Sequence, residues 1–295
     1  MKIEASLDFV YQQFAQSDIF HGHGIDNPWD EAVALVLTVL DLPMDSGDEV
    51  LTQEIPEDKW RYILALAKKR VEERVPLSYL LRKAWFMGLP FYVDERVLIP
   101  RSPFGEWIEK RFEPWVKPER VKRILEIGTG SGCMAIAASY MFPNAHIDAV
   151  DISLEALAVA EQNVHEHQKQ DRVHLFQSDC FSALIPQHQY DLIISNPPYV
   201  SQQEIDLLPD EYHHEPVKTA LFADNQGMAI AQGILEAAAQ YMSPHAVLVI
   251  EVGYNDEPWL EHYPKVPFTW LACEQGGEGL FLLTREEVEA IHVRK

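Results

Sequence analysis

Hydrophobic positions along the chain follow two different spacings, which predict a helical part and a part built on strands. In residues 1–75 apolar side chains recur at helical spacing. One helix is predicted over 28–40, behind the cap residue Asn27, and a second over about 57–74, closed by Pro76. We therefore expect residues 1–75 to form an N-terminal helical domain.

Residues 76–103 carry short runs of β-forming residues. The runs 84–87 and 91–93 are separated by Gly88-Leu89-Pro90, and Val97-Leu98-Ile99 follows as a further short run. This pattern predicts a linker with a β-hairpin between the helical domain and the rest of the chain.

Over residues 104–295 apolar runs alternate with helical stretches, a pattern typical of βαβ units with a parallel sheet covered on both faces. The last two runs, 268–272 and 279–283 around Gln275-Gly276-Gly277-Glu278, predict a hairpin that ends the sheet with an antiparallel strand. The expected fold class is therefore α/β. The other predicted strands are Arg123–Ile127, His146–Val150, Val173–Gln177, Tyr190–Ser195 and Ala246–Val252.

Composition narrows the class of protein further. The apolar stretches are far shorter than the ~20 residues of a membrane-spanning helix, and the first residues do not resemble a signal peptide. We therefore expect a cytoplasmic protein that does not contact membranes. Cys133, Cys180 and Cys273 form no CxxC pair, and His165 and His167 would point in different directions on a helix, so no metal site is expected.

The formal net charge of −22 bears on the partner. Such a charge disfavours contact with DNA and other bare phosphate backbones, which attract basic surfaces, and it favours a basic partner. Only the segment 76–120 is locally cationic, with 8 basic against 6 acidic residues.

A glycine-rich loop indicates a cofactor site. The apolar strand 124–127 runs into Gly128-Thr129-Gly130-Ser131-Gly132, where glycines let the backbone turn sharply and approach a ligand. Asp151, 23 residues after Gly128, closes the next strand, where its carboxylate can accept hydrogen bonds from both ribose hydroxyls of a nucleoside. Asp179 could accept from an adenine amine, and Glu126 could attract the cationic end of an amino-acid-bearing ligand.

Two alternatives to a methyltransferase loop stay open at this point. The spacing G-x-G-x-G differs from the G-x-G-x-x-G that faces a dinucleotide pyrophosphate. This difference favours S-adenosylmethionine, which has no phosphate, over a dinucleotide. A purely structural loop is the other alternative, and Asp179 could equally be a turn or cap residue.

The motif Asn196-Pro197-Pro198-Tyr199 indicates the reacting group. It follows an apolar strand and so lies at the sheet edge where open α/β folds bind ligands. The Asn196 side-chain oxygen and the Pro197 carbonyl can accept both N–H bonds of a planar NH2 group, while Tyr199 offers it a flat face. The prolines hold the turn rigid because their φ angles are fixed. A turn that merely ends a buried strand is the structural alternative.

Taken together, these motifs resemble those of the HemK-type protein glutamine N5-methyltransferases over residues 26–284. Asn-Pro-Pro-Tyr is shared with DNA adenine and RNA guanine amino-methyltransferases, whereas the block from Pro76-Leu77-Ser78-Tyr79-Leu80 to Arg101 is more specific. Within the family, Lys83-Ala84-Trp85-Phe86 and 101–106 resemble the branch acting on the large-subunit ribosomal protein L-three. Ser102 and Gly105 depart from the release-factor branch.

The resemblance implies a Rossmann-like class I methyltransferase sheet and S-adenosylmethionine as the cofactor. It also implies a basic ribosomal protein as the substrate, within an assembling particle or free, and an N-terminal domain that docks it. Gly128 to Gly132, Asp151 and Asn196 would contact the cofactor, and Asn196 to Tyr199 would hold the glutamine amide. Cys180 stands where relatives often have a tryptophan beside the adenine, and Phe181 could substitute for it.

Two further features have open interpretations. Arg101 could help to dock the substrate or form an internal salt bridge. The segment 210–216 could form a substrate-side flap or an ordinary loop, and 21–24 is predicted to be a loop.

Overall fold

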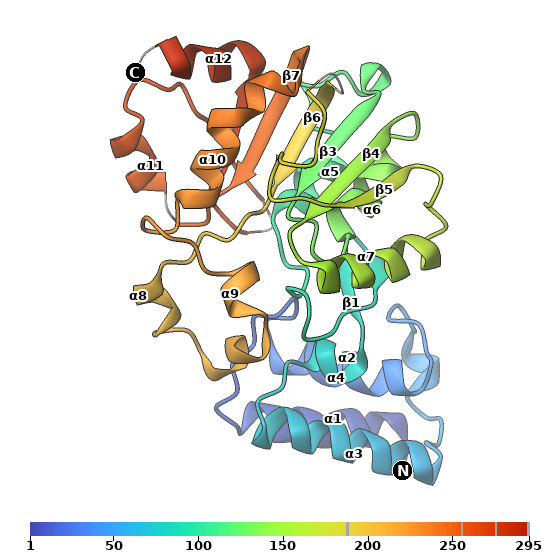
Figure 1. Ribbon diagram of the computed structural model, residues 1–295. Helices are drawn as coiled ribbons and strands as arrows, with labels where there is room; N and C mark the ends of the chain where they lie inside the picture. Colours follow the sequence, from blue (N-terminus) through green and yellow to red (C-terminus); the bar gives the residue numbers. More distant parts are fainter. Residues whose placement is uncertain (187–188, 255, 275, 294–295) are drawn as a thin grey trace.

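The carboxyl-terminal part of the molecule is built on one seven-stranded sheet, in the order β5-β4-β3-β6-β7-β9-β8 (Figure 1). The computed structural model describes residues 1–186, 189–254, 256–274 and 276–293. Strands β5 to β7 in this order are parallel, while β9 is antiparallel to both of its neighbours, which confirms the predicted α/β class with its antiparallel end. The strands are β3 (Arg123–Ile127), β4 (His146–Asp151), β5 (Val173–Gln177), β6 (Tyr190–Ser195), β7 (Met242–Glu251), β8 (Thr269–Leu271) and β9 (Leu280–Thr284).

Both faces of this sheet are buried, as continuous apolar strands require. Ile124 belongs to the core on one face and its neighbour Leu125 to the core on the other. The face of Ile124 is covered by α5 (Phe104–Glu109), α6 (Cys133–Met141) and α7 (Leu154–Glu166). The face of Leu125 is covered by α10 (Ala229–Ala237), α11 (Asp256–His262) and α12 (Arg285–Val293).

The amino-terminal part is a separate helical lobe with its own core, below the sheet in Figure 1. Asn27 caps α2 by accepting a hydrogen bond from the backbone N–H of Asp30, as its position predicted. No helix was located in the sequence before Asn27, yet α1 buries Ile3, Leu7, Val10 and Phe14. The helices of this lobe are α1 (Ile3–Ala15), α2 (Pro28–Val39), α3 (Glu57–Glu72) and α4 (Leu77–Leu81).

A short hairpin joins the two parts. Strands β1 (Ala84–Phe86) and β2 (Leu89–Phe91) are antiparallel, and Met87 and Gly88 turn between them at φ 51° and 72°. The run 97–99, in contrast, is not a strand. Two of its backbone groups instead form hydrogen bonds with side chains. The Tyr79 hydroxyl donates to the Val97 carbonyl, and the Glu215 carboxylate accepts from the Ile99 N–H.

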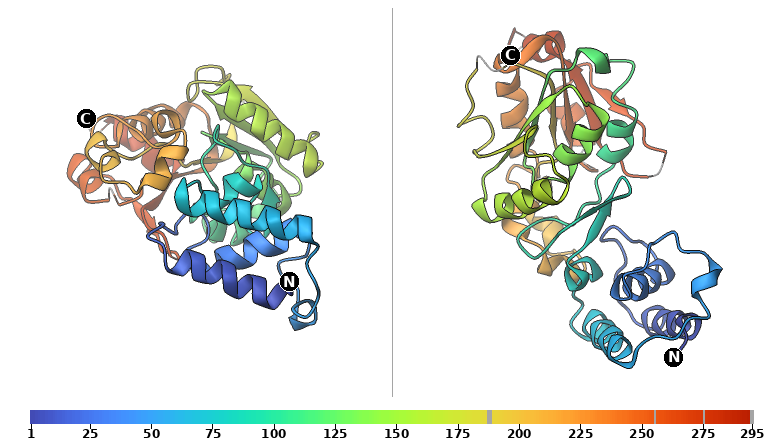
Figure 2. Two further views of the ribbon diagram at one scale, coloured as in Figure 1. Left: turned by 90° about the horizontal axis from the view of Figure 1, so that it is seen from below. Right: turned by 90° about the vertical axis from the view of Figure 1, so that its right-hand side faces the viewer.

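The connection between β6 and α10 returns towards the helical lobe, as the two further views show (Figure 2). It contains α8 (Gln202–Ile205), the 3-10 helix η3 (Asp210–His214) and α9 (Val217–Ala220). Other 3-10 helices are η1 (Asp48–Val50), η2 (Pro118–Arg120) and η4 (Ala238–Gln240). Within the described residues, no helix has the length and apolar character needed to cross a membrane.

Candidate active site

The glycine loop and Asp151 are joined by hydrogen bonds at the carboxyl ends of β3 and β4. Gly128, Gly130 and Gly132 have φ angles of 76°, 54° and 80°, which only glycine adopts without strain. The Asp151 carboxylate accepts from the backbone N–H of Gly130 and of Ser153, each at 2.9 Å. Asp151 thus holds the glycine loop in place, and its carboxylate lies at the same edge of the sheet as Gly128 and Gly130.

A narrow cavity of about 150 Å³ lies at this edge of the sheet. It brings together predicted site residues from four separate segments, in agreement with the rule that ligands bind at the carboxyl ends of parallel strands. The predicted site residues that line it are Gly128, Gly130, Asp151, Asp179, Cys180, Asn196, Pro197 and Pro198.

Several predicted cofactor residues lie away from this cavity. Thr129, Ser131 and Gly132 are buried and do not line it. Phe181 is also buried, and its ring stacks on Tyr241 at 4.4 Å between centroids, so it packs in the core and does not face the cavity. Cys180 lines the cavity at the position considered for an adenine contact.

Glu126 lies buried beneath the glycine loop. Its Oε2 accepts hydrogen bonds from the Thr129 hydroxyl and the Ala135 N–H, whereas its Oε1 has no partner within the described residues. Burial raises the pKa of Glu126 to about 8, against the effect of these two hydrogen bonds. A buried acceptor without a donor is costly, and a cationic ligand group would satisfy it.

The turn after β6 separates the cofactor-side cavity from a second one. Asn196 lines both, and its side chain makes no hydrogen bond within the described part of the chain. We call the second cavity, also about 150 Å³, the slot; its walls include Arg101, Tyr199 and Glu251. An amide group in the slot would therefore meet Asn196 next to the cofactor-side cavity.

Glu251 and Ser102 were not identified as site residues from the sequence. Glu251 Oε1 accepts from the Tyr199 hydroxyl at 2.9 Å, and Oε2 accepts from the Ser102 hydroxyl. Burial raises the pKa of Glu251 to about 7, although both hydrogen bonds oppose the shift. Glu251 holds the Tyr199 ring against Gly253, where a Cβ would come within 2.6 Å of that ring. The pattern that indicated Asp151, an acidic residue at the end of a parallel strand, could also have identified Glu251.

The segment after the Asn196 turn is bound to the rest of the protein by buried ion pairs. Arg101 forms a bidentate pair with Glu215 at 2.6 and 2.7 Å, so of its two interpretations the internal salt bridge is the one observed. His23 lies beside this pair, and burial and Arg101 lower its pKa to about 3. Buried ion pairs therefore hold the segment 210–216 against the rest of the protein, and its last residue, Pro216, lines the cofactor-side cavity.

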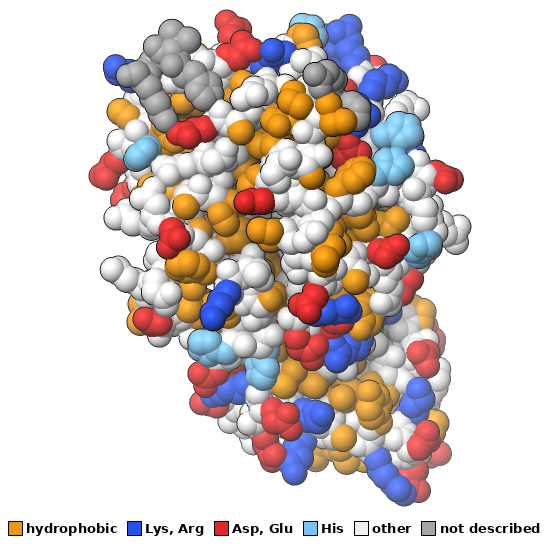
Figure 3. All heavy atoms as spheres, viewed as in Figure 1, with side chains coloured by type: hydrophobic (Ala, Val, Ile, Leu, Met, Phe, Trp, Pro, Cys, Tyr) orange, Lys and Arg blue, Asp and Glu red, His pale blue; other side chains and the backbone are white. Residues whose placement is uncertain are grey.

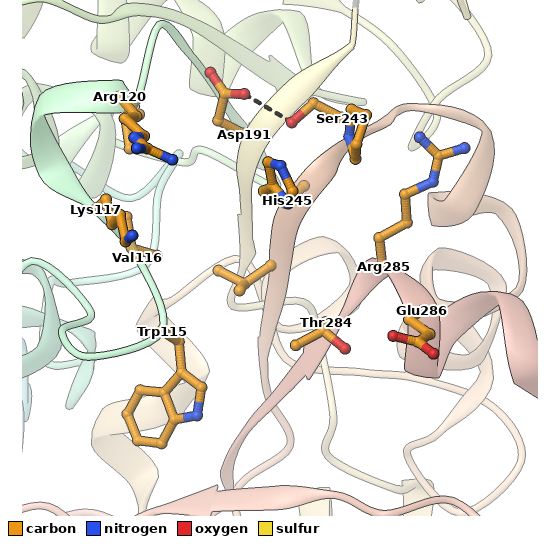
Figure 4. Close-up of a pocket in the computed structure, with 14 residues that line it drawn as sticks. Trp115, Val116, Lys117, Arg120, Asp191, Ser243, His245, Thr284, Arg285 and Glu286 are labelled. Carbon is orange, nitrogen blue, oxygen red and sulfur yellow. Dashed lines mark hydrogen bonds between the residues drawn. The ribbon is translucent and has the colours of Figure 1, made fainter.

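The largest of the described cavities, about 640 Å³, lies elsewhere (Figure 4). It opens at the amino-terminal ends of the parallel strands, between Trp115, Asp191, His245 and Arg285, and includes no predicted site residue. Asp191 there accepts hydrogen bonds from the Ser243 hydroxyl and from the backbone N–H of Lys122.

Comparison with known proteins identifies the class. A family model described as methyltransferase small domain matches residues 114–220, which contain the glycine loop, Asp151 and the Asn196 turn. The solved structure of the hMettl16 catalytic domain in complex with the MAT2A 3'UTR hairpin 6 is similar at a TM-score of 0.53, with 16% identity over 95% of this chain and 91% of that one. At this identity the likeness shows the fold alone. Fold and site thus define a Rossmann-like class I methyltransferase.

Two curated relatives identify the family. The chain is 43% identical over 277 residues to the ribosomal protein uL3 glutamine methyltransferase of Francisella tularensis subsp. tularensis, covering 94% of this chain and 88% of the relative. It is 42% identical over 283 residues to the protein of the same name from Neisseria meningitidis serogroup B, covering 96% and 92%. The chain belongs to the family of ribosomal protein uL3 glutamine methyltransferases. Membership confirms the predicted family and implies the general use of S-adenosylmethionine.

Proposed function

We propose that this protein transfers a methyl group from S-adenosylmethionine to the side-chain amide nitrogen of a glutamine in ribosomal protein uL3. The observation that carries the proposal is the position of Asn196, which lines both the cofactor-side cavity and the slot. The names of both relatives support the substrate, and so does the net charge of −22, because a strongly acidic enzyme attracts a basic ribosomal protein.

We expect three contacts with an amino-acid-bearing nucleoside: two in the cofactor-side cavity, and one with Glu126, which lies beneath the glycine loop and does not line that cavity. Glu126 Oε1 lacks a donor and would accept from the ammonium group. Asp151 would accept hydrogen bonds from the ribose hydroxyls, and Asp179 and Cys180, which line the same cavity, would contact the adenine base. Gly130 leaves open space where a Cβ would stand, so the backbone can approach the ligand closely.

When bound, S-adenosylmethionine supplies an electrophilic methyl group on a sulfonium centre. The amide nitrogen is a weak nucleophile because its lone pair is delocalised. The side-chain oxygen of Asn196 and the backbone carbonyl of Pro197 would accept its two N–H bonds and direct the nitrogen towards the methyl group. Alignment of this kind is worth about 7–11 kcal/mol in well-oriented reactions. The methylated nitrogen then loses one proton.

The direct test is transfer of labelled methyl groups to purified substrates. We expect label in the glutamine of isolated uL3 or of ribosomal particles from cells lacking this protein. Label in release factors, rRNA or DNA, with none in uL3, would overturn the proposal.

Because ribosomal proteins act in the cytoplasm, we expect the enzyme to act there too. The helical lobe, residues 1–75, is proposed to dock the substrate, and residues 104–295 to carry out catalysis, with 76–103 linking them.

Replacing Asp151 by alanine is expected to weaken S-adenosylmethionine binding by about 1.5–3 kcal/mol, the value of a lost charge-assisted hydrogen bond. The change also releases the Gly130 N–H, so the loop loses one of its fixed contacts. Calorimetric titration would measure this effect. Unchanged affinity in a folded variant would remove Asp151 from the site.

Cofactor binding near neutral pH is expected to release about one proton from Glu126. Its pKa of about 8 keeps the free carboxyl mostly protonated at pH 7, and an ammonium group beside Oε1 would lower that pKa. Since a proton leaves on binding, affinity should rise as the pH increases from 6 to 8. Titrations in two buffers of different ionisation enthalpy would count the proton. Equal heats in both buffers, or release persisting in Glu126→Gln, would contradict this assignment.

A further inference from the structure

A third cavity continues the path that leads out of the slot. This groove, about 530 Å³, is lined by Gly22 and 24–26 of the helical lobe, the hairpin residues 85–87, part of 100–109, and Gly276 with Gly277. Arg101, Pro103 and Gly277 line both the groove and the slot. A chain lying in the groove could therefore place one side chain in the slot beside Asn196.

Glycines let the walls of the groove pack closely where the groove joins the slot. A Cβ on Gly277 would come within 2.8 Å of Pro103, and Gly277 has φ +90°, which side chains rarely adopt. A Cβ on Gly105 would come within 3.2 Å of Met87 on the hairpin. A larger residue at Gly277 or Gly105 would force these walls to shift, so the shape of the junction depends on the two glycines.

The groove and the slot mouth are acidic. Asp26 and Glu109 line the groove and Glu278 lines the slot, and none of the three forms a salt bridge within the described residues. The arginine between them, Arg101, is neutralised by Glu215. Lys83 lies 5.3 Å from the ring centroid of Trp85 at the edge of the groove. Glu106 also lines the groove but is paired with Lys110, so these three carboxylates and Lys83 leave an excess of two negative charges at the rim.

This acidity is local and not only a property of the whole chain. Lys and Arg side chains gather at the upper edge of the molecule in Figure 3, whereas on the helical lobe they lie among Asp and Glu side chains. Charges further apart than the Debye length, about 8 Å at physiological ionic strength, contribute little to one another. A charged ligand in the groove would therefore respond mainly to Asp26, Glu109 and Glu278.

We propose that the groove binds an extended segment of the substrate next to the target glutamine, and that Asp26, Glu109 and Glu278 select Lys or Arg in that segment. This inference rests on the proposed function. The apolar walls from the hairpin and Pro103 would cover the backbone of the segment, while the three carboxylates meet its cations at the rim. Such contacts determine which glutamine is presented more than how fast it reacts.

The test is the triple variant Asp26→Asn, Glu109→Gln and Glu278→Gln, compared with the matched variant Asp45→Asn, Glu161→Gln and Asp171→Asn. Both remove three exposed negative charges that have no salt bridge in the described residues. At low salt the first variant should raise KM for uL3 about tenfold, in line with rim pairs of modest strength, and leave kcat and cofactor affinity unchanged. The matched variant should raise KM less than twofold.

A second measurement uses glutamine peptides flanked by lysines or by glutamates as probes. The wild-type enzyme should prefer the lysine peptide, and the groove variant should lose that preference. Equal KM changes in the two triple variants, or an unchanged peptide preference, would overturn the inference. Failure of the wild-type enzyme to methylate uL3 at all would instead refute the proposed function.

Discussion

Alanine in place of Asn196 is expected to lower kcat for glutamine methylation by at least ~100-fold, the loss that follows removal of one oriented transition-state contact. The side chain has no hydrogen bond to give up within the described residues, and it is only partly buried. Its removal should therefore leave the fold intact. The effect should appear in kcat because the contact acts on the attacking nitrogen.

The measurement requires saturating cofactor, since Asn196 also lines the cofactor-side cavity. Affinity for S-adenosylmethionine would be titrated separately. Asn144→Ala, an exposed asparagine in the turn before β4, is the matched control and should retain full activity. A kcat within a few-fold of the wild-type value, with cofactor bound, would show that the turn does not hold the amide.

Local patterns predicted most of the sheet and part of the site. Strands 123–127, 173–177 and 190–195 match the structure residue for residue. The central strands 123–127 and 190–195 are buried, and buried parallel strands have nearly continuous apolar sequences. The final hairpin followed from two apolar runs around a glycine turn, although Gln275 of that turn lies outside the described residues. Asp151 was predicted because the carboxyl ends of parallel strands meet at one edge of the sheet.

Tertiary partners could not be predicted in the same way. Glu215 binds Arg101 across 114 positions, and no local spacing relates the two. Phe181 follows Cys180 directly, but the two side chains point to different sides, Cys180 to the cavity and Phe181 to the core. Glu251 could have been found, since an acid ends the buried strand β7 just as Asp151 ends β4.

Methionine in place of Arg70 is expected to lower the free energy of unfolding by about 3–5 kcal/mol, the usual cost of removing one member of a buried ion-pair network. Arg70 is 1% exposed and makes two hydrogen bonds to Glu31, at 2.9 and 3.0 Å, and one to the Phe20 carbonyl. Its Nη1 also lies 3.4 Å from Oε1 of Glu211, which is fully buried and follows the Asn196 turn in sequence. Without Arg70, two carboxylates lose a cation inside the protein.

Lys68→Met is the matched control on the same helix. Lys68 pairs with Glu72 at the surface, 3.6 Å away, and loss of such a pair costs only about 0.3–0.5 kcal/mol. Denaturant unfolding of both variants would separate a buried network from a general effect of lost positive charge. Adding Glu31→Leu to Arg70→Met should recover part of the stability, because it removes a carboxylate that has lost its partner. Similar losses for Arg70→Met and Lys68→Met would show that the buried network between the helical lobe and Glu211 stabilises the fold no more than a surface pair does.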